Sequence, residues 1–411
     1  MKNQAAIVTD EKQIEGVLTR GVADILPSKA ELKKILMSGR RIRLYQGFDP
    51  TAPQLHVGSM VGLRKLRDFQ NLGHEVIFLL GDGTGQAGDP SGKTRARDKY
   101  FSHKELLENA KLYKAQVQKI LQFVGLNPAK ILFNGRWLNK LRLTDMLNIA
   151  GNFTLQQLSE RDLFQERMKR GEPVNLREFL YPLLQGYDSV AMDVDLEIGG
   201  SDQTFNMLIG RSLMKKMREK EKFVLSTPLL TDAQGRKIGK SEGNALWLTE
   251  KPEELYGKIM ALSDDIIVKG LEYLTDVPME DIRLVEKDLK KGVNQKQHKE
   301  KLAFEIVAQL HDKDAAQSAH DSWKAVFSNK EVPETITEVP AEEGVLLDDI
   351  LQKYRIVPSK SEVKRLIIGG GIKNIETGEK ITNEKLPVIV PITLKIGKKT
   401  FIRIRIKKKK R

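Results

Sequence analysis

The stretches that decide the fold are RIRLYQGF (residues 41–48), SMVGLRKLRDFQNLG (59–73) and EVIFLL (75–80). The first and third are short, largely apolar runs typical of buried strands. The middle stretch has its apolar residues at helical spacing and ends at Gly73. A strand, a helix and a second strand in succession predict parallel strand pairing with the helix packed on one face of the sheet.

The same alternation continues through the first 249 residues. The pattern predicts a long helix at 104–125 and strands within 130–133, 193–200 and 223–230, with a helix at 204–220 before the last strand. The fold class expected is therefore α/β, with a parallel sheet covered by helices on both faces. In such sheets ligands bind at the carboxyl ends of the strands. An edge strand of the opposite direction would also be compatible with the pattern.

The remainder of the chain changes character twice. Residues 250–329 have helical spacing and little strand signal, which predicts a small α-helical domain. The prolines and glutamates of residues 330–344 indicate a linker. Residues 345–411 predict an α+β module of two short helices followed by strands, in which Arg403 and Arg405 lie on the face opposite the alternating isoleucines.

Composition excludes several classes of protein. The chain has 411 residues, 69 Lys and Arg against 55 Asp and Glu, no cysteine, and six histidines without close ligand spacing. Disulfide frameworks and thiolate zinc sites are excluded, no metal site is expected, and a reducing cytoplasm is the natural compartment. No signal peptide or membrane span is apparent.

The C-terminal segment is strongly basic. Residues 395–411 hold ten Lys or Arg and no acid, which suits either binding to a nucleic-acid backbone or a solvated tail.

A glycine-rich stretch after the strand at 75–80, QAGDPSGKT (residues 86–94), resembles a phosphate-binding loop but does not fit one. The P-loop requires a glycine five residues before Gly92, where this chain has Ala87. Asp89 would place a carboxylate against the phosphates, and Pro90 lacks an amide donor. The sequence therefore excludes a P-loop nucleotidase.

Four motifs follow one another along the α/β region. They are HVGS (56–59), YPLLQGYD (181–188), GGSDQ (199–203) and RKIGKS (236–241). A helix that begins at HVGS suits a phosphate, and two lysines three residues apart can neutralise a triphosphate. Taken alone, HVGS could equally be an ordinary capped helix start, and RKIGKS could be an ordinary solvated loop. Tyr181, Gln185 and Asp188 share one helix face among apolar neighbours, where unsatisfied polar groups would be costly.

In this order the motifs resemble those of the class I aminoacyl-tRNA synthetases, and within them the bacterial-type tyrosyl-tRNA synthetases. The resemblance covers nearly the whole chain, and residues 345–411 are similar to an S4 RNA-binding domain. It implies a Rossmann-like catalytic domain that activates L-tyrosine with ATP and Mg²⁺ and transfers tyrosine to tRNA(Tyr). It also implies a homodimer. The substrate carboxylate is the nucleophile in this reaction, so catalysis rests on positioning and electrostatics.

The resemblance also assigns roles to individual residues. It implies that catalysis depends on Thr51, His56, Lys237, Lys240 and Ser241. It implies that tyrosine is bound by Tyr45, Gly47, Asp49, Asp89, Tyr181, Gln185, Asp188 and Gln203. It implies that ATP is bound by His56, Gly58, Ser59, Gly200, Asp202, Lys237 and Lys240.

The chain departs from the family's pattern at two positions. Ser59 stands where the first signature usually has a second histidine, and Thr204 stands where many relatives have an aromatic residue. Three other readings stay open at this point: a tryptophanyl-tRNA synthetase, an RNA-binding protein with a decayed synthetase site, and a small-molecule adenylyltransferase. Tyr45 and Asp188 suit a phenol hydroxyl and argue against tryptophan, while the adenylyltransferase would leave the basic C-terminus without a purpose.

Overall fold

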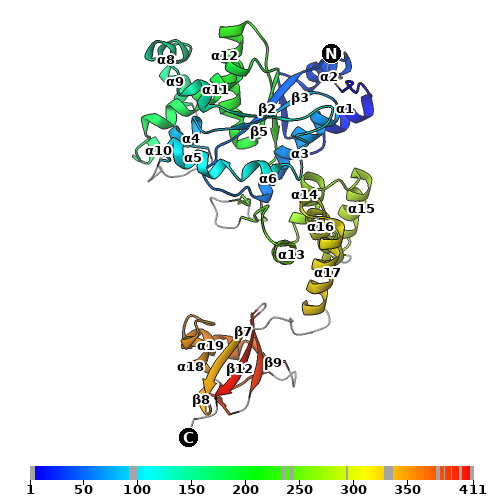
Figure 1. Cartoon of the computed structure of the whole chain (residues 1–411), viewed down its shortest axis with the longest axis vertical. Coiled ribbons are helices and arrows are strands. Elements are labelled where there is room, and N and C mark those ends of the chain that lie inside the picture. The colour runs from blue at the N-terminus through cyan, green and yellow to red at the C-terminus, as the bar shows by residue number, and fades with distance from the viewer. Residues whose placement is uncertain are drawn as a thin grey trace. The chain divides into compact units, whose positions relative to one another are not determined.

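The computed structural model describes residues 5–91, 100–160, 162–232, 235, 237–239, 245–292, 295–327, 337–375, 380–383, 385–389, 391–397 and 400–407. The chain divides into two compact units, Met1–Gln317 and Ser318–Arg411, which are described separately (Figure 1). No helix among these residues is long and apolar enough to cross a membrane.

The first unit is built on a six-stranded sheet of order β1-β6-β5-β2-β3-β4. Its strands are β1 (Asp24–Leu26), β2 (Arg43–Phe48), β3 (Glu75–Leu80), β4 (Lys130–Phe133), β5 (Leu196–Gly200) and β6 (Phe223–Thr227). Five strands run parallel, and β1 pairs antiparallel with β6 at the edge. The predicted α/β class with a Rossmann-like parallel sheet is confirmed, and the edge strand has the opposite direction.

Helices cover both faces of this sheet (Figure 1). The helices of this part of the unit are α1 (Glu11–Val17), α2 (Lys29–Met37), α3 (Val57–Asn71), α4 (Thr84–Ala87), α5 (His103–Ala110), α6 (Tyr113–Val117), α7 (Gly135–Leu138), α8 (Leu143–Ala150), α9 (Leu155–Ser159), α10 (Asp162–Lys169), α11 (Leu176–Met192) and α12 (Thr204–Arg218), with the 3₁₀ turn η1 (Ser201–Gln203). Of these, α8, α9 and α10 lie away from the sheet (Figure 1). The central strands are apolar on both sides because helices bury both faces, as in β3, whose last five residues are all buried.

The continuous helix expected at 104–125 was wrong. The chain there forms α5 and α6 with an interruption between them. Side chains of this segment bond the carbonyls of the loop after β2: Asn109 donates to Pro50 at 2.9 Å, and Tyr113 donates to Ala52 at 2.8 Å. These tertiary bonds tie the segment to the loop, and helical periodicity carries no information about them.

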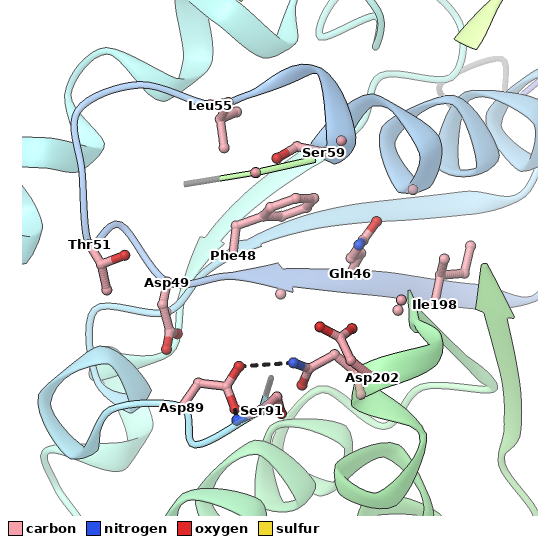
Figure 2. A pocket seen from close by; sticks show the side chains of 18 of the residues that line it. Gln46, Phe48, Asp49, Thr51, Leu55, Ser59, Asp89, Ser91, Ile198 and Asp202 are labelled. Atoms are coloured by element: carbon pink, nitrogen blue, oxygen red, sulfur yellow. Dashed lines mark hydrogen bonds between the residues drawn. The ribbon is translucent and has the colours of Figure 1, made fainter. Parts of the chain in front are cut away.

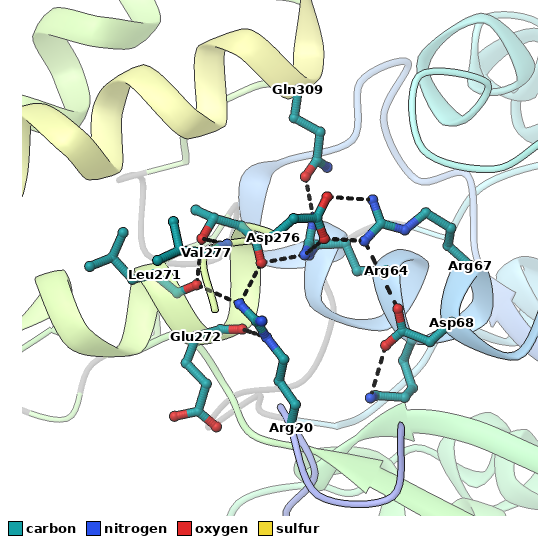
Figure 3. Close-up of polar contacts among 11 residues, drawn as sticks. Arg20, Arg64, Arg67, Asp68, Leu271, Glu272, Asp276, Val277 and Gln309 are labelled. Atoms are coloured by element: carbon teal, nitrogen blue, oxygen red, sulfur yellow. Dashed lines mark hydrogen bonds and ion pairs between the residues drawn. The ribbon is translucent and has the colours of Figure 1, made fainter. Parts of the chain in front are cut away.

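The helical part of the first unit packs against the middle of α3. It comprises α13 (Pro252–Met260), α14 (Ile266–Leu274), α15 (Met279–Lys290), α16 (Gln295–Leu310) and the first residues of α17 (Lys313–Phe327), a helix that continues into the second unit. Arg64 of α3 is buried and donates to Asp276 at 2.6 Å and to the carbonyl of Thr275, while Arg67 also binds Asp276 (Figure 3). Burial lowers the pKa of Arg64 to about 10. This network fixes the helix that begins at the HVGS motif.

The second unit contains a four-stranded sheet of order β7-β12-β11-β9 and a two-stranded sheet of β10 and β8. Its elements are β7 (Thr337–Glu342), β8 (Val345–Leu346), α18 (Leu347–Lys353), α19 (Lys360–Ile368), β9 (Ile372–Asn374), β10 (Pro387–Val388), β11 (Ile392–Ile396) and β12 (Thr400–Lys407). Ile402 and Ile404 are buried while Arg403 and Arg405 are exposed, as the alternation predicts. Ser359 caps α19 by accepting the Glu362 amide at 3.2 Å.

One boundary of this unit differs from the sequence prediction. Residues 330–344 were expected to be a linker, but Thr337–Glu342 forms β7, which pairs in parallel with β12. The two prolines and the glutamates of this stretch suggested an extended linker, yet Val339 and Ala341 alternate inward and are buried. Residues 328–336 lie outside the described part of the chain.

Candidate active site

A cavity of about 480 Å³ lies at the carboxyl ends of the parallel strands. Its walls include the residues that follow β2, β3, β5 and β6, together with the polar face of α11 and the start of α3. In Figure 2, Asp49, Asp89 and Asp202 lie on one side of β2, and Leu55 and Ser59 lie on the other. The cavity is therefore where ligands bind in sheets of this kind.

The structure brings together all the candidate site residues that it describes. The cavity is lined by Tyr45, Gly47, Asp49, Thr51, His56, Gly58, Ser59, Asp89, Tyr181, Gln185, Asp188, Gly200, Asp202, Gln203 and Lys237. Lys240 and Ser241 lie outside the described residues. Residues up to 192 positions apart in the sequence thus share one chamber, 45 to 237.

Helix α11 supplies the polar stripe. Its start is fixed by a capping box between Asn175 and Glu178, and its end by Asp193 in the left-handed region. Tyr181 is buried and donates from its hydroxyl to Asp49 Oδ2 at 3.0 Å. Burial raises the pKa of Tyr181 well above its usual value, and the neighbouring Asp49 carboxylate adds to this shift. Tyr181 is therefore a neutral hydrogen-bonding group.

Asp188 lies deeper on the same face and is only 2% exposed. Its two oxygens accept from Trp137 Nε1 at 2.8 Å and Asn134 Nδ2 at 3.0 Å. Burial raises the pKa of Asp188 well above its usual range, and these two hydrogen bonds oppose the shift. Neither donor was among the predicted site residues. Asn134 directly follows a predicted strand, at the edge where ligands bind, and this position was a usable signal.

A second set of side chains forms a chain of amide contacts. Gln203 Nε2 donates to Asp89 Oδ2 at 2.8 Å, and the Ser91 amide donates to Asp89 Oδ1 at 2.8 Å. Asn206 Nδ2 donates to Gln203 Oε1 at 2.9 Å and to Gln185 Oε1 at 3.0 Å. Asn206 is fully buried and was missed by the sequence reasoning. It connects α12 to the polar face of α11.

His56 and Gly58 of the HVGS motif lie next to Ile238 and Gly239, which belong to the described part of the RKIGKS motif, and all four line the cavity. His56 stands immediately before α3, at the N-cap position. A side chain on Gly58 would come within about 3.0 Å of the His56 ring and of the Ile238 carbonyl oxygen, so only glycine fits here. One on Gly239 would lie 3.4 Å from His56. The two motifs, nearly 180 residues apart in the sequence, are neighbours.

Lys237 is the described lysine of the second motif. Its ammonium lies 2.8 Å from Asp202 Oδ2, and its side chain is 41% exposed. Thr51, His56 and Ser59 line the same cavity and are partly exposed. Among the described residues, no three His, Asp or Glu side chains gather as a metal site.

Comparison with known proteins agrees with this arrangement. The family described as tRNA synthetases class I (W and Y) matches residues 37–328. The tyrosine–tRNA ligase of Carboxydothermus hydrogenoformans is 42% identical over 410 residues, covering 96% of this chain and 98% of its own. That of Geobacter metallireducens is 41% identical over 400 residues, covering 94% and 97%.

Solved structures are similar to the larger part of the chain. A C-terminally truncated mitochondrial tyrosyl-tRNA synthetase of Coccidioides posadasii superposes with a TM-score of 0.61 at 27% identity, covering 75% of this chain and 91% of that one. The Archaeoglobus fulgidus tyrosyl-tRNA synthetase complexed with L-tyrosine gives 0.59 at 21% identity, with coverages of 76% and 100%. At that identity the second match speaks for the fold alone.

Proposed function

Because this chain belongs to the tyrosyl-tRNA synthetases of class I, we propose that it activates L-tyrosine with ATP and then transfers tyrosine to the 3′ end of tRNA(Tyr). The observation that carries the proposal is the buried polar stripe of α11 facing the cavity where the two signature motifs meet. In the first step a carboxylate oxygen of tyrosine bonds to the α-phosphorus of ATP, and the bond to pyrophosphate breaks. No side chain is required as a covalent nucleophile.

One part of the cavity, the amino-acid half, binds tyrosine in this proposal. We define it by Tyr45, Gly47, Asp49, Asp89, Tyr181, Gln185, Asp188 and Gln203. Asp188 and Tyr45 bind the phenol hydroxyl, and Asp89, Tyr181 and Gln185 hold the ammonium. A site that pairs a buried carboxylate with a substrate hydroxyl rejects an analogue without one by about 10⁵; tyrosyl-tRNA synthetase is the standard example of this principle.

The other part, the nucleotide half, binds ATP. We define it by Thr51, His56, Gly58, Ser59, Gly200, Asp202, Lys237, Lys240 and Ser241, of which the last two lie outside the described residues. Thr51 and His56 would contact the phosphates, Gly200 and Asp202 the ribose, and the lysines the pyrophosphate. Mg²⁺ would enter with the phosphates of ATP as part of the substrate.

The second unit and an exposed face support the proposed partners. The unit presents Arg403 and Arg405 from one face of β12, which suits an RNA backbone and supports the S4 assignment.

Four large apolar side chains are exposed on α8, α9 and the start of α11: Leu143, Leu147, Leu155 and Leu176. Exposed large apolar side chains of this number support a protein contact, and we propose a homodimer. The absence of cysteine supports a cytoplasmic location.

Pyrophosphate exchange with each of the twenty amino acids tests the activation step. We expect ATP labelling only with tyrosine, in the presence of Mg²⁺. Exchange with tryptophan instead would favour the related synthetase, and no exchange with any amino acid would favour an RNA-binding protein with a decayed site, in which Ser59 is one of the losses.

Truncation after residue 327 tests the role of the second unit. The cut belongs there and not at 345, because β7 is part of the C-terminal sheet. We expect the truncated protein to retain pyrophosphate exchange and to lose tRNA charging. Charging at the rate of the full chain would contradict the RNA-binding assignment.

A further inference from the structure

A buried cluster of three side chains lies beneath the amino-acid half, and none of its members was a predicted site residue. Lys222 is fully buried just before β6, and its ammonium binds Glu197 Oε2 and, at 2.9 Å, Ser189 Oγ. Glu197 is 2% exposed and lies on β5, where it also lines the cavity. Ser189 is fully buried and follows Asp188 on α11.

The cluster touches two residues of the amino-acid half. Gln185 Nε2 donates to Glu197 Oε1 at 3.0 Å. The Tyr45 hydroxyl lies 3.0 Å from Ser189 Oγ. Lys222 therefore lies behind the side chains that meet the substrate, and Glu197 contacts Gln185 from the wall of the cavity; neither is assigned a contact with the substrate.

The chain makes room for this lysine. A Cβ on Gly210 of α12 would lie 2.6 Å from Lys222 Nζ and 3.1 Å from Ser189 Oγ. Glycine at this position therefore leaves the space that the ammonium occupies. A fully buried ion pair contributes little net free energy to folding, because the cost of desolvating both charges offsets most of their attraction. This pair is therefore better explained by a role in orienting its neighbours than by a gain in stability.

Donor and acceptor chemistry defines that role. An ionised carboxylate can only accept hydrogen bonds, so Gln185 must turn its NH₂ group toward Glu197. The carbamoyl oxygen of Gln185 then faces the other way, where it accepts from Asn206 at 3.0 Å and retains a second lone pair. A substrate ammonium has donors only and requires this oxygen. A protonated Glu197 could donate to Gln185 and allow the amide to turn over.

We propose that Lys222 and Glu197 are positioning residues for tyrosine: the ammonium pairs with the Glu197 carboxylate and holds it in place, and the carboxylate fixes the Gln185 amide with its oxygen toward the cavity. This inference rests on the proposed function, because it assigns the Gln185 oxygen to the ammonium of tyrosine. Ser189 connects the same ion pair to Tyr45. Its hydroxyl accepts from Lys222 and donates to Glu197 at 3.5 Å, so its oxygen keeps one lone pair that can accept a hydrogen bond from the Tyr45 hydroxyl.

The test removes the ammonium and follows tyrosine binding against pH. In Lys222→Met, Glu197 is buried without a counter-charge, and burial of this kind raises the pKa of a carboxyl group. We expect the KM for tyrosine in pyrophosphate exchange to rise by about 10- to 100-fold between about pH 8 and pH 6, with the KM for ATP unchanged. Wild type should show no such pH dependence over this range.

Two further variants separate positioning from packing. Lys222→Met/Glu197→Gln carries no titratable group at either position, so its tyrosine KM should be as independent of pH as that of wild type. The other charged or titratable groups are Asp188 and Tyr45 near Glu197 and Arg211 near Lys222, and all three are present in all these proteins. Lys299→Met removes a comparably buried lysine from α16 and should leave the tyrosine KM unchanged.

The outcomes are distinguishable. If wild type shows no pyrophosphate exchange with tyrosine, the proposed function is wrong, and so is this inference, which rests on it. If wild type exchanges but the tyrosine KM of Lys222→Met matches wild type at every pH, or is raised equally at every pH, the positioning role is overturned. Should Lys222→Met not fold, Glu197→Gln with Lys222 in place is measured instead. We expect its tyrosine KM to rise with the KM for ATP unchanged, and an unchanged tyrosine KM overturns the proposal.

Discussion

The amino-acid half and the nucleotide half of the cavity are built differently. In the amino-acid half, Asp188 and Tyr45 are 2% and 1% exposed and have partners on fixed helices and strands. In the nucleotide half, Lys237 is 41% exposed and pairs with Asp202 across a loop. Exposed ion pairs contribute about 0–1 kcal/mol, so Lys237 can exchange Asp202 for a phosphate at little cost. The buried groups of the amino-acid half are therefore suited to selecting the substrate, and the exposed Lys237 is suited to changing its partner when ATP binds.

The largest effect should come from breaking the amino-acid half at its most buried carboxylate. Asp188→Asn replaces one of two acceptor oxygens by an NH₂ group, although Asn134 and Trp137 each donate to a different oxygen and the proposed substrate hydroxyl needs an acceptor as well. We expect kcat/KM for tyrosine to fall about 1,000-fold and the preference for tyrosine over phenylalanine to shrink, with the KM for ATP nearly unchanged. Pyrophosphate exchange with varied tyrosine, phenylalanine and ATP measures all three.

Asp195→Asn is the matched control for this variant. Asp195 is also buried, but it stands just before β5, at the amino end of the strand and away from the cavity, where it pairs with Arg40 and Lys220. Both substrates should keep their wild-type KM in this variant. An equal loss of tyrosine and ATP binding in Asp188→Asn would remove Asp188 from the phenol site.

The same division explains what the sequence could predict. Short apolar runs place Asp49 and Gly200 at strand ends, and parallel strands bring those ends together; the strand predicted within 223–230 ends earlier, at Thr227. Helical spacing likewise puts Tyr181, Gln185 and Asp188 on one face. The gathering of the cavity residues follows from these two rules.

Partnerships between elements do not follow from either rule. Lys222 and Glu197 are 25 residues apart, the first just before β6 and the second on the neighbouring strand β5, and nothing in their local sequence distinguishes them from exposed charges. Asn206 reaches Gln185 only because Gly186 and Gly210 allow α11 and α12 to approach closely; a Cβ on Gly186 would lie 3.1 Å from the Gly210 amide nitrogen. Such contacts depend on tertiary distances that periodicity does not encode.

The nucleotide half should respond to a charge deletion with a loss of rate. Lys237→Ala removes a cation that would stabilise the negative charge developing on the phosphates. We expect adenylate formation to slow about 100-fold at saturating substrates while the affinity for tyrosine stays at its wild-type value. Single-turnover formation of tyrosyl-adenylate, together with equilibrium binding of tyrosine, separates the two quantities.

Lys258→Ala provides the comparison for Lys237. Lys258 is similarly exposed and pairs with Glu250 at 2.7 Å, but it does not line the cavity. Its loss should leave the rate of adenylate formation unchanged. A large loss of tyrosine affinity in Lys237→Ala would contradict the separation of the two halves.

The smallest effect tests whether the amino-acid half works as a connected set. Asn206→Ala leaves Asp188 and Tyr45 in place but removes the amide that holds Gln185 and Gln203 together. Because only the orientation of two uncharged side chains is relaxed, we expect the KM for tyrosine to rise about tenfold, equivalent to about 1.4 kcal/mol, with kcat and the KM for ATP unchanged.

Asn127→Ala, which removes two bonds to the carbonyls of Gln70 and His74 outside the cavity, should leave the tyrosine KM at its wild-type value. If Asn206→Ala also leaves it there, Gln185 keeps its orientation through Glu197 alone, and the amide chain is packing. If the tyrosine KM of the Asn206→Ala/Lys222→Met protein at pH 6 exceeds the product of the two single effects, the two anchors of Gln185 partly substitute for one another. That result would make the amino-acid half a redundantly held site and would strengthen its contrast with the nucleotide half.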